Sequence, residues 1–222
     1  MALARHQDGL RPIGEALGAV IVGLDRVVAK KAGKTVIQNL ADTQGWEAPE
    51  EGTERYRLLD LALASRGTGY SFRGGEGAHD AWSLARTCAA FACERDCIDV
   101  SRDDGVTEAE ARMAMTQWGL TEVRTRHAAP GDLLMFQTDK GFHVAIMSAP
   151  GGDLSWSMLP GRRLAEARMI HAAPAKSVVE SWVGPFWMEQ LLAAFSFDTP
   201  GKPIRGKADW LSVAADITRR AA

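Results

Sequence analysis

The sequence lacks an excess of charge of either sign. Its 26 Lys and Arg residues are matched by 28 Asp and Glu residues, which gives a net charge of -2 at pH 7. Binding to nucleic acid or to an anionic membrane surface depends on a concentrated positive field, whereas the basic residues here are interspersed with acidic ones. We therefore expect neither nucleic acid nor a membrane surface among the partners of this protein.

A long hydrophobic run is also missing. The most apolar stretch, residues 16–29, is interrupted by two glycines and by Asp25 and Arg26, and it is shorter than the roughly 20 apolar residues of a membrane-spanning helix. The first residues lack the basic segment, the apolar core and the cleavage site of a secretory signal. We expect a protein without a membrane span that is made in the cytoplasm and leaves it, if at all, by another route.

Cysteine is scarce. The three cysteines, Cys88, Cys93 and Cys97, are odd in number and crowded into one short segment. A disulfide framework needs paired cysteines spread along the chain, so this distribution favours free thiols and a reducing compartment.

Turn-forming and polar segments divide the chain into three predicted parts. Residues 10–32 have helical apolar spacing and are followed by Gly33, and residues 44–52 form an acidic linker rich in turn formers. We predict an N-terminal helical extension over residues 1–52, a main domain over residues 53–198, and a tail with a short helix over residues 199–222.

Within the main domain the pattern changes from helices to strands. Residues 53–66 predict a helix, which is followed by a glycine-rich loop at residues 67–77. Asp80 is a good N-cap for a second helix that runs to Phe91. A third helix is predicted to begin at Thr107 and to end near Trp118. Short apolar or alternating segments then predict strands; they lie at residues 133–136, 142–147, 169–172, 177–180 and 191–197. Helices followed by strands indicate an α+β domain with an antiparallel sheet.

Two histidines and one helix start have the features of a hydrolytic site. A cysteine hydrolase needs a thiolate, a histidine that generates it, and a third group that orients the imidazole. The N-terminus of a helix is a favourable position for the thiolate because its free N–H groups and dipole lower the thiol pKa. Ala81 occupies that position, and His143 and His171 lie on predicted strands that can be neighbours.

Six motifs occur in a fixed order along residues 67–172. They are Gly67-Thr68-Gly69-Tyr70, Gly74-Gly75, Asp80-Ala81-Trp82-Ser83-Leu84-Ala85-Arg86, Pro130-Gly131-Asp132-Leu133-Leu134-Met135-Phe136, His143-Val144-Ala145-Ile146 and Ile170-His171-Ala172. With these motifs the chain resembles the NlpC/P60 family of cysteine peptidases over residues 53–197, and within it the branch of phage tails and gene-transfer particles. The resemblance implies a papain-like fold, with the helix that bears the nucleophile packed on the antiparallel sheet.

The resemblance also implies roles for individual residues. Position 81 corresponds to the nucleophile, His143 to the general base and acid, and His171 to the group that orients it. Tyr70 would contact the substrate or the developing oxyanion, and Asp80 and Trp82 would border the substrate, although Asp80 is first of all a helix cap. The implied substrate is a stem peptide of peptidoglycan, cut at a bond such as γ-D-glutamyl to a diamino acid, and neither a metal nor another cofactor is implied.

Alanine at position 81 is the departure that matters most, since a methyl group cannot attack a carbonyl. Ser83 and Gly69 also depart from the family pattern, which usually has glycine and proline there. We expect the chain to be inert, and Cys88 cannot replace the nucleophile because it lies two helical turns further on. An engineered Cys→Ala change is the favoured origin, since both histidines are intact, and natural loss is the alternative.

Three functions stay open on the sequence. The first is a cell-wall peptidase delivered by a virion or a secretion machine to the periplasm or cell wall, with phage-tail or secretion-system proteins, or an inhibitory immunity protein, as further partners. The second is a non-catalytic module that binds peptidoglycan or supports an assembly. The third is an acyltransferase of the same superfamily, for which the sequence offers no visible acyl pocket.

Overall fold

A computed structural model describes residues 34–71, 78–99, 106–139, 141–151, 164–174 and 177–197. These residues form a mixed α+β structure, which confirms the predicted class. The helices predicted over residues 10–32 and within residues 199–222 lie outside the described residues. The helices are α2 (Val36–Gln44), α3 (Glu54–Ala64), α4 (Ala81–Cys93), α5 (Glu108–Gln117), α7 (Gly184–Gln190) and the short 3-10 helix η1 (Thr125–His127).

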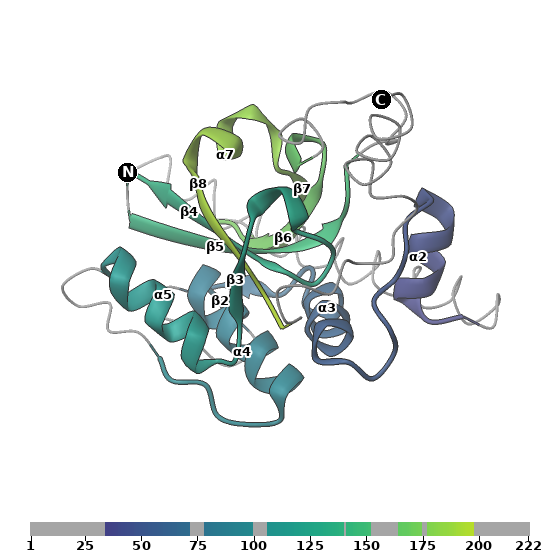
Figure 1. The fold of residues 1–222 in the computed structure, drawn as a ribbon, viewed down its shortest axis with the longest axis horizontal. Coiled ribbons are helices and arrows are strands. Elements are labelled where there is room, and N and C mark those ends of the chain that lie inside the picture. Colours follow the sequence, from purple (N-terminus) through teal and green to yellow (C-terminus); the bar gives the residue numbers. More distant parts are fainter. Residues whose placement is uncertain are drawn as a thin grey trace, which may run out of the picture.

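One antiparallel sheet forms the centre of the structure, with the strand order β3-β8-β4-β5-β6-β7. Figure 1 shows α3, α4 and α5 on one side of this sheet and α7 on the other. All five predicted strands are present. The bounds are β3 (Thr121–Val123), β4 (Leu133–Thr138), β5 (Gly141–Ala149), β6 (Arg168–Ala172), β7 (Val178–Trp182) and β8 (Leu191–Ser196), and a small parallel pair is formed by β1 (Gly69–Tyr70) and β2 (Ala78–His79).

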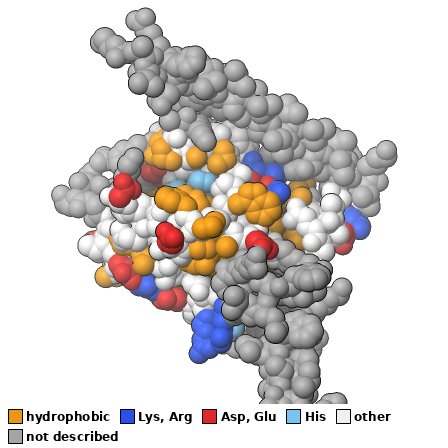
Figure 2. Space-filling model, turned by 90° about the horizontal axis from the view of Figure 1, so that it is seen from above, with side chains coloured by type: hydrophobic (Ala, Val, Ile, Leu, Met, Phe, Trp, Pro, Cys, Tyr) orange, Lys and Arg blue, Asp and Glu red, His pale blue; other side chains and the backbone are white. Residues whose placement is uncertain are grey.

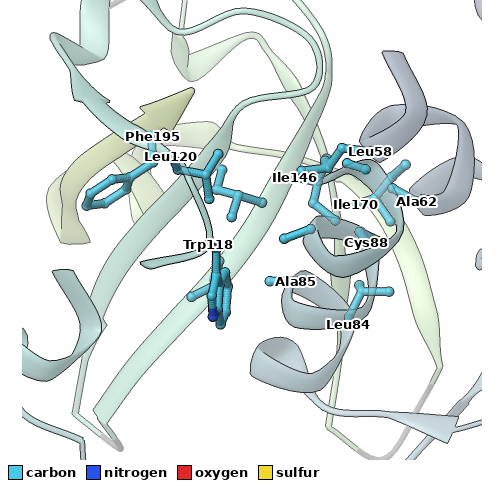
Figure 3. Close-up of a cluster of buried hydrophobic side chains, with 14 of the residues drawn as sticks. Leu58, Ala62, Leu84, Ala85, Cys88, Trp118, Leu120, Ile146, Ile170 and Phe195 are labelled. Atoms are coloured by element: carbon cyan, nitrogen blue, oxygen red, sulfur yellow. The ribbon is translucent and has the colours of Figure 1, made fainter. Parts of the chain in front are cut away.

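Each face of the sheet has its own core, because successive side chains of a strand point to opposite faces. On β5, Val144 and Ile146 pack into the larger core with α3 and α4, whereas Ala145 and Met147 belong to a second core that includes Val183. Figure 3 shows the larger core between helices and sheet; it labels Leu58, Ala62, Leu84, Ala85, Cys88, Trp118, Leu120, Ile146, Ile170 and Phe195.

Helix α4 lies close to the sheet because its inner face is made of small residues. Ala85, Cys88, Ala89 and Ala92 are almost completely buried. Small side chains let the helix backbone approach its neighbours closely, so a fully buried Cys88 acts here as a small apolar residue, as the sequence predicted. The position of the first turn of α4 is thereby fixed relative to the strands beneath it.

A buried ion pair holds α3 against the turn that begins β4. The guanidinium of Arg55 lies 3.3 Å from the carboxylate of Asp132, and both side chains are buried. Arg55 Nε also donates a hydrogen bond of 2.8 Å to the carbonyl of Pro130. Gly131 between them has a φ of +90°, and its amide donates to the carbonyl of Met147 on β5. The Pro130-Gly131-Asp132 motif therefore docks the start of β4, a central strand of the sheet, onto α3.

Two helices were not predicted. Helix α2 begins at a capping box formed by Thr35 and Gln38, and Ile37 is fully buried in the larger core. The residues just before the predicted linker thus pack with the main body. Helix α7 follows β7, with Pro185 in its first turn, and lies between two predicted strands in a stretch for which the sequence predicted no element. Within the described part of the chain, no helix has the length and apolarity needed to cross a bilayer.

The close approach at Gly131 leads to a prediction about stability. A Cβ at this position would lie 2.6 Å from Arg55 Cγ and 2.7 Å from the Arg55 carbonyl oxygen, whereas Gly52, with a similar φ of +85°, has open space around it. We expect Gly131→Ala to lower the free energy of unfolding by about 3 kcal/mol and Gly52→Ala by about 1 kcal/mol, because only the first adds a clash to the unfavourable φ. Urea denaturation measures both; equal losses would contradict the docking role of Gly131.

Candidate active site

His143 and His171 lie next to each other on neighbouring strands. Because Ile146 of β5 pairs with Ile170 of β6, both histidine side chains point to the face of the sheet that carries the second core. His143 Nε2 lies 3.0 Å from His171 Nδ1, and the rings meet edge to face. The structure therefore brings together the two histidines that the sequence singled out, in hydrogen-bonding contact.

Ser181 extends this pair on the next strand. It faces Met169 in the register of β6 and β7, and its Oγ lies 3.0 Å from His171 Nε2. A continuous line of hydrogen bonds thus runs from Ser181 through His171 to His143. Sequence reasoning missed Ser181; the available signal was its strand position, which puts it on the same face as His171.

An aromatic side chain covers the other side of His143. Trp187 of α7 stacks on the imidazole with ring centroids 4.8 Å apart and an angle of 28° between the planes. Trp187 also contacts Phe136, at 4.9 Å between centroids, and Phe186, which is 64% exposed. The view onto the α7 side of the molecule shows histidine atoms among hydrophobic side chains (Figure 2). The histidine pair is therefore reached across an apolar, partly aromatic surface.

These surroundings keep His143 neutral. Burial and, after it, the charge of His171 lower its pKa from the ordinary 6.5 to about 3, although the carboxylate of Asp80 acts in the opposite direction. An uncharged imidazole has a free electron pair, but a pKa of about 3 makes it a weaker proton acceptor than an ordinary histidine.

Position 81 lies beside the beginning of β5. Of its two neighbours, Asp80 is close enough to affect the pKa of His143, and Trp82 donates a hydrogen bond of 3.3 Å from its Nε1 to the carbonyl of Phe142, the residue before His143. Ala81 is 9% exposed. The two neighbours of position 81 thus relate the first turn of α4 to the start of β5, Trp82 through a hydrogen bond and Asp80 through the effect of its charge on His143.

The capping of α4 accounts for one departure from the family pattern. Asp80 accepts a hydrogen bond of 2.8 Å from the amide of Ser83, and the hydroxyl of Ser83 accepts one of 2.9 Å from the amide of Asp80. This reciprocal capping box confirms Asp80 as the N-cap and fixes the helix start. Serine at position 83 therefore strengthens the turn that carries position 81.

The three residues predicted to contact substrate have different surroundings. Tyr70 is half-buried on β1, opposite His79 of β2. Asp80 is buried as a helix cap, and Trp82 is 6% exposed in the larger core, edge to face with Trp118. Of the three, Tyr70 has the most surface to offer a ligand, and the contact of each with substrate stays a prediction.

None of the three cysteines lies at the first turn of α4. Cys88 is fully buried, and burial raises the pKa of its thiol to about 12. Cys93 and Cys97 are free thiols with sulfur atoms 3.9 Å apart at the far end of α4, opposite to the end that carries position 81. Among the described residues there is also no group of three or more His, Cys, Asp and Glu side chains that could hold a metal ion.

Comparison with known proteins adds no relative from which a role could be transferred. No family model matches the chain. No curated protein matches it either.

The pKa of His143 predicts an effect of pH on stability. Since His143 has a lower pKa in the folded state than in the unfolded state, only the unfolded state binds its proton between pH 6.5 and about 3, and stability falls as pH falls through this window. We expect His143→Gln to flatten that part of the curve, by about 1.4 kcal/mol for each unit of the pKa difference. Thermal or urea unfolding across this pH range measures it.

His127→Gln is the matched control, because His127 is exposed on η1 and no described feature shields it from water. The difference between the two variants then gives the contribution that is specific to His143. A slope for His143→Gln that equals the slope for the unaltered protein would show that His143 titrates as an ordinary histidine.

Proposed function

We propose that this protein has the papain-like fold of NlpC/P60 peptidases and the active site of a peptidoglycan-cleaving cysteine hydrolase that lacks its nucleophile. The observation that carries the proposal is the contact of His143 Nε2 with His171 Nδ1, beside the N-terminus of a capped helix. The helix start supplies a position for a thiolate, and the two strands supply a base and its orienting partner. These are the three parts that cysteine hydrolysis requires.

We infer the path of the proton transfers from this contact. His171 contacts Nε2 of His143, so Nδ1 is the ring nitrogen left to exchange a proton with a thiol at position 81. With cysteine at position 81, Nδ1 would take the thiol proton, and the thiolate would attack the carbonyl carbon of a stem-peptide amide. His143 would then give this proton to the leaving amine, and water would release the peptide acid from the thioester.

The start of α4 would stabilise the intermediate. Backbone N–H groups at a helix N-terminus point outward, and a negatively charged oxygen near them gains hydrogen bonds and a favourable dipole interaction. Tyr70 is the second candidate donor, since it lies on the short strand pair that leads into α4. The amide of Ser83 already donates a hydrogen bond to Asp80, so the amides left for the oxyanion are those nearest to position 81.

A second function is favoured by Ala81 itself. A site with base, orienting group and helix start in place but no nucleophile can bind a stem peptide without cutting it. In this reading the protein is a peptidoglycan-binding module, and the aromatic surface formed by Phe186 and Trp187 contributes to retention on the cell wall.

Restoring the thiol separates the two functions. We expect Ala81→Cys to release stem-peptide fragments from purified peptidoglycan at a rate at least about a thousandfold above the unaltered protein, because a missing nucleophile removes several powers of ten in rate. Mass spectrometry of the soluble fragments identifies the bond that is cut. The double variant with Ala81→Cys and His143→Gln is the matched control, and it should be as inactive as the unaltered protein.

If the folded Ala81→Cys protein released no stem-peptide fragments from cell walls of several chemotypes, the peptidase proposal would be contradicted. In that case, sedimentation of the unaltered protein with insoluble peptidoglycan tests the binding function. Loss of co-sedimentation in a Phe186→Ser variant would support that function, whereas a protein that stays in solution would reject it.

A further inference from the structure

Ser181 stands at the end of the hydrogen-bonded line that leads to His143. Its Oγ lies 3.0 Å from His171 Nε2, and His171 Nδ1 lies 3.0 Å from His143 Nε2. His171, in the middle of this line, is 7% exposed, whereas Ser181 and His143 at its ends are half-buried. We propose that Ser181 is a positioning residue that sets, through His171, which ring nitrogen of His143 carries the proton. The tautomer expected for His143 rests on the proposed function, whereas the dependence of the tautomers on Ser181 does not.

The two ring nitrogens of a neutral imidazole have opposite roles, since one donates and the other accepts. If His171 Nε2 donates its proton to Ser181 Oγ, then His171 Nδ1 must accept from His143 Nε2. The proton of His143 is then on Nε2, and Nδ1 has a free electron pair. In this arrangement His143 can take a proton from a thiol at position 81.

The reverse arrangement blocks the base. If the hydroxyl of Ser181 donates to His171 Nε2, then His171 Nδ1 carries a proton and donates it to His143 Nε2. The remaining proton of His143 is forced onto Nδ1, which can no longer accept one. The orientation of the Ser181 hydroxyl hydrogen is thus coupled, through both imidazole rings, to whether Nδ1 of His143 can accept a proton.

The register of β6 and β7 explains why Ser181, and not its neighbour Glu180, contacts His171. Ser181 lies on the same face of the sheet as His171, whereas the adjacent Glu180 points to the other face. There Glu180 is held by Arg66 at 3.1 Å and by the hydroxyl of Ser148 at 2.6 Å. The carboxylate next in sequence is therefore committed elsewhere, and the hydroxyl of Ser181 is the group that β7 offers to His171.

The tautomers can be measured on the protein as it is, with alanine at position 81. Nitrogen-15 NMR of the histidine rings at pH 7.5 distinguishes a protonated from an unprotonated ring nitrogen. We expect the unaltered protein to have His143 protonated on Nε2 and His171 protonated on Nε2. In Ser181→Ala the resonances of both rings should move toward values averaged over two tautomers, and Ser181→Thr should restore the original pattern.

Ser148→Ala is the matched control, because Ser148 is another serine on the sheet with a hydrogen-bonded hydroxyl, but it donates to Glu180 on the opposite face. It should leave the histidine resonances unchanged. The proposal is overturned if Ser181→Ala, folded by circular dichroism, leaves both rings as they were, or if His143 of the unaltered protein carries its proton on Nδ1.

A kinetic readout links the tautomer to function. In the Ala81→Cys background, Ser181→Ala should lower kcat on the order of 10- to 100-fold, the usual cost of losing a group that orients a functional histidine, and leave KM within about twofold. If Ala81→Cys is inactive but the tautomers depend on Ser181, the proposed function fails and this inference stands. If Ala81→Cys is active while neither kcat nor the tautomers respond to Ser181→Ala, this inference fails and the proposed function stands.

Discussion

The contact between the imidazoles of His143 and His171 is the interaction on which the site depends. It joins β5 to β6 at 3.0 Å on the face that α7 covers, and it leaves Nδ1 of His143 as the nitrogen available for chemistry. The rest of the structure supports this contact. The capping box at Asp80 and Ser83 fixes the start of α4, the hydrogen bond from Trp82 to Phe142 ties that start to β5, and Trp187 holds the ring of His143 from above.

The low pKa of His143 follows from the groups around its imidazole. The ring lies between Trp187 and His171, and among the described residues the carboxylate of Asp80 is the group that opposes the shift. A thiolate at position 81 would supply the missing negative charge, because an anion next to a histidine favours the imidazolium form. The same ion pair would be strengthened by the dipole of α4. The thiolate would thus raise the pKa of His143, and the imidazolium would lower the pKa of the thiol. With alanine at position 81 neither effect occurs.

Much of this arrangement could be predicted from the sequence, because it rests on local rules. Alternation placed β5 and β6, the capping preference of Asp80 placed the start of α4, and motif spacing singled out His143 and His171. Ser181 and Trp187 could not be found in this way, since their importance comes from the register of β6 and β7 and from α7 (Gly184–Gln190), a short helix that the sequence did not predict. Nor could the sequence show that Trp82 is a core residue, because a tryptophan beside a helix cap fits a cleft or a core equally well.

The acidity of a thiol introduced by Ala81→Cys tests the proposed site most directly. The rate of its alkylation by iodoacetamide as a function of pH gives the thiol pKa without any substrate. The site predicts a pKa well below the value of about 8.5 for a free cysteine, and a return toward that value when His143→Gln is added. A thiol pKa at or above 8.5 that does not respond to His143→Gln would show that position 81 and His143 do not form a catalytic pair.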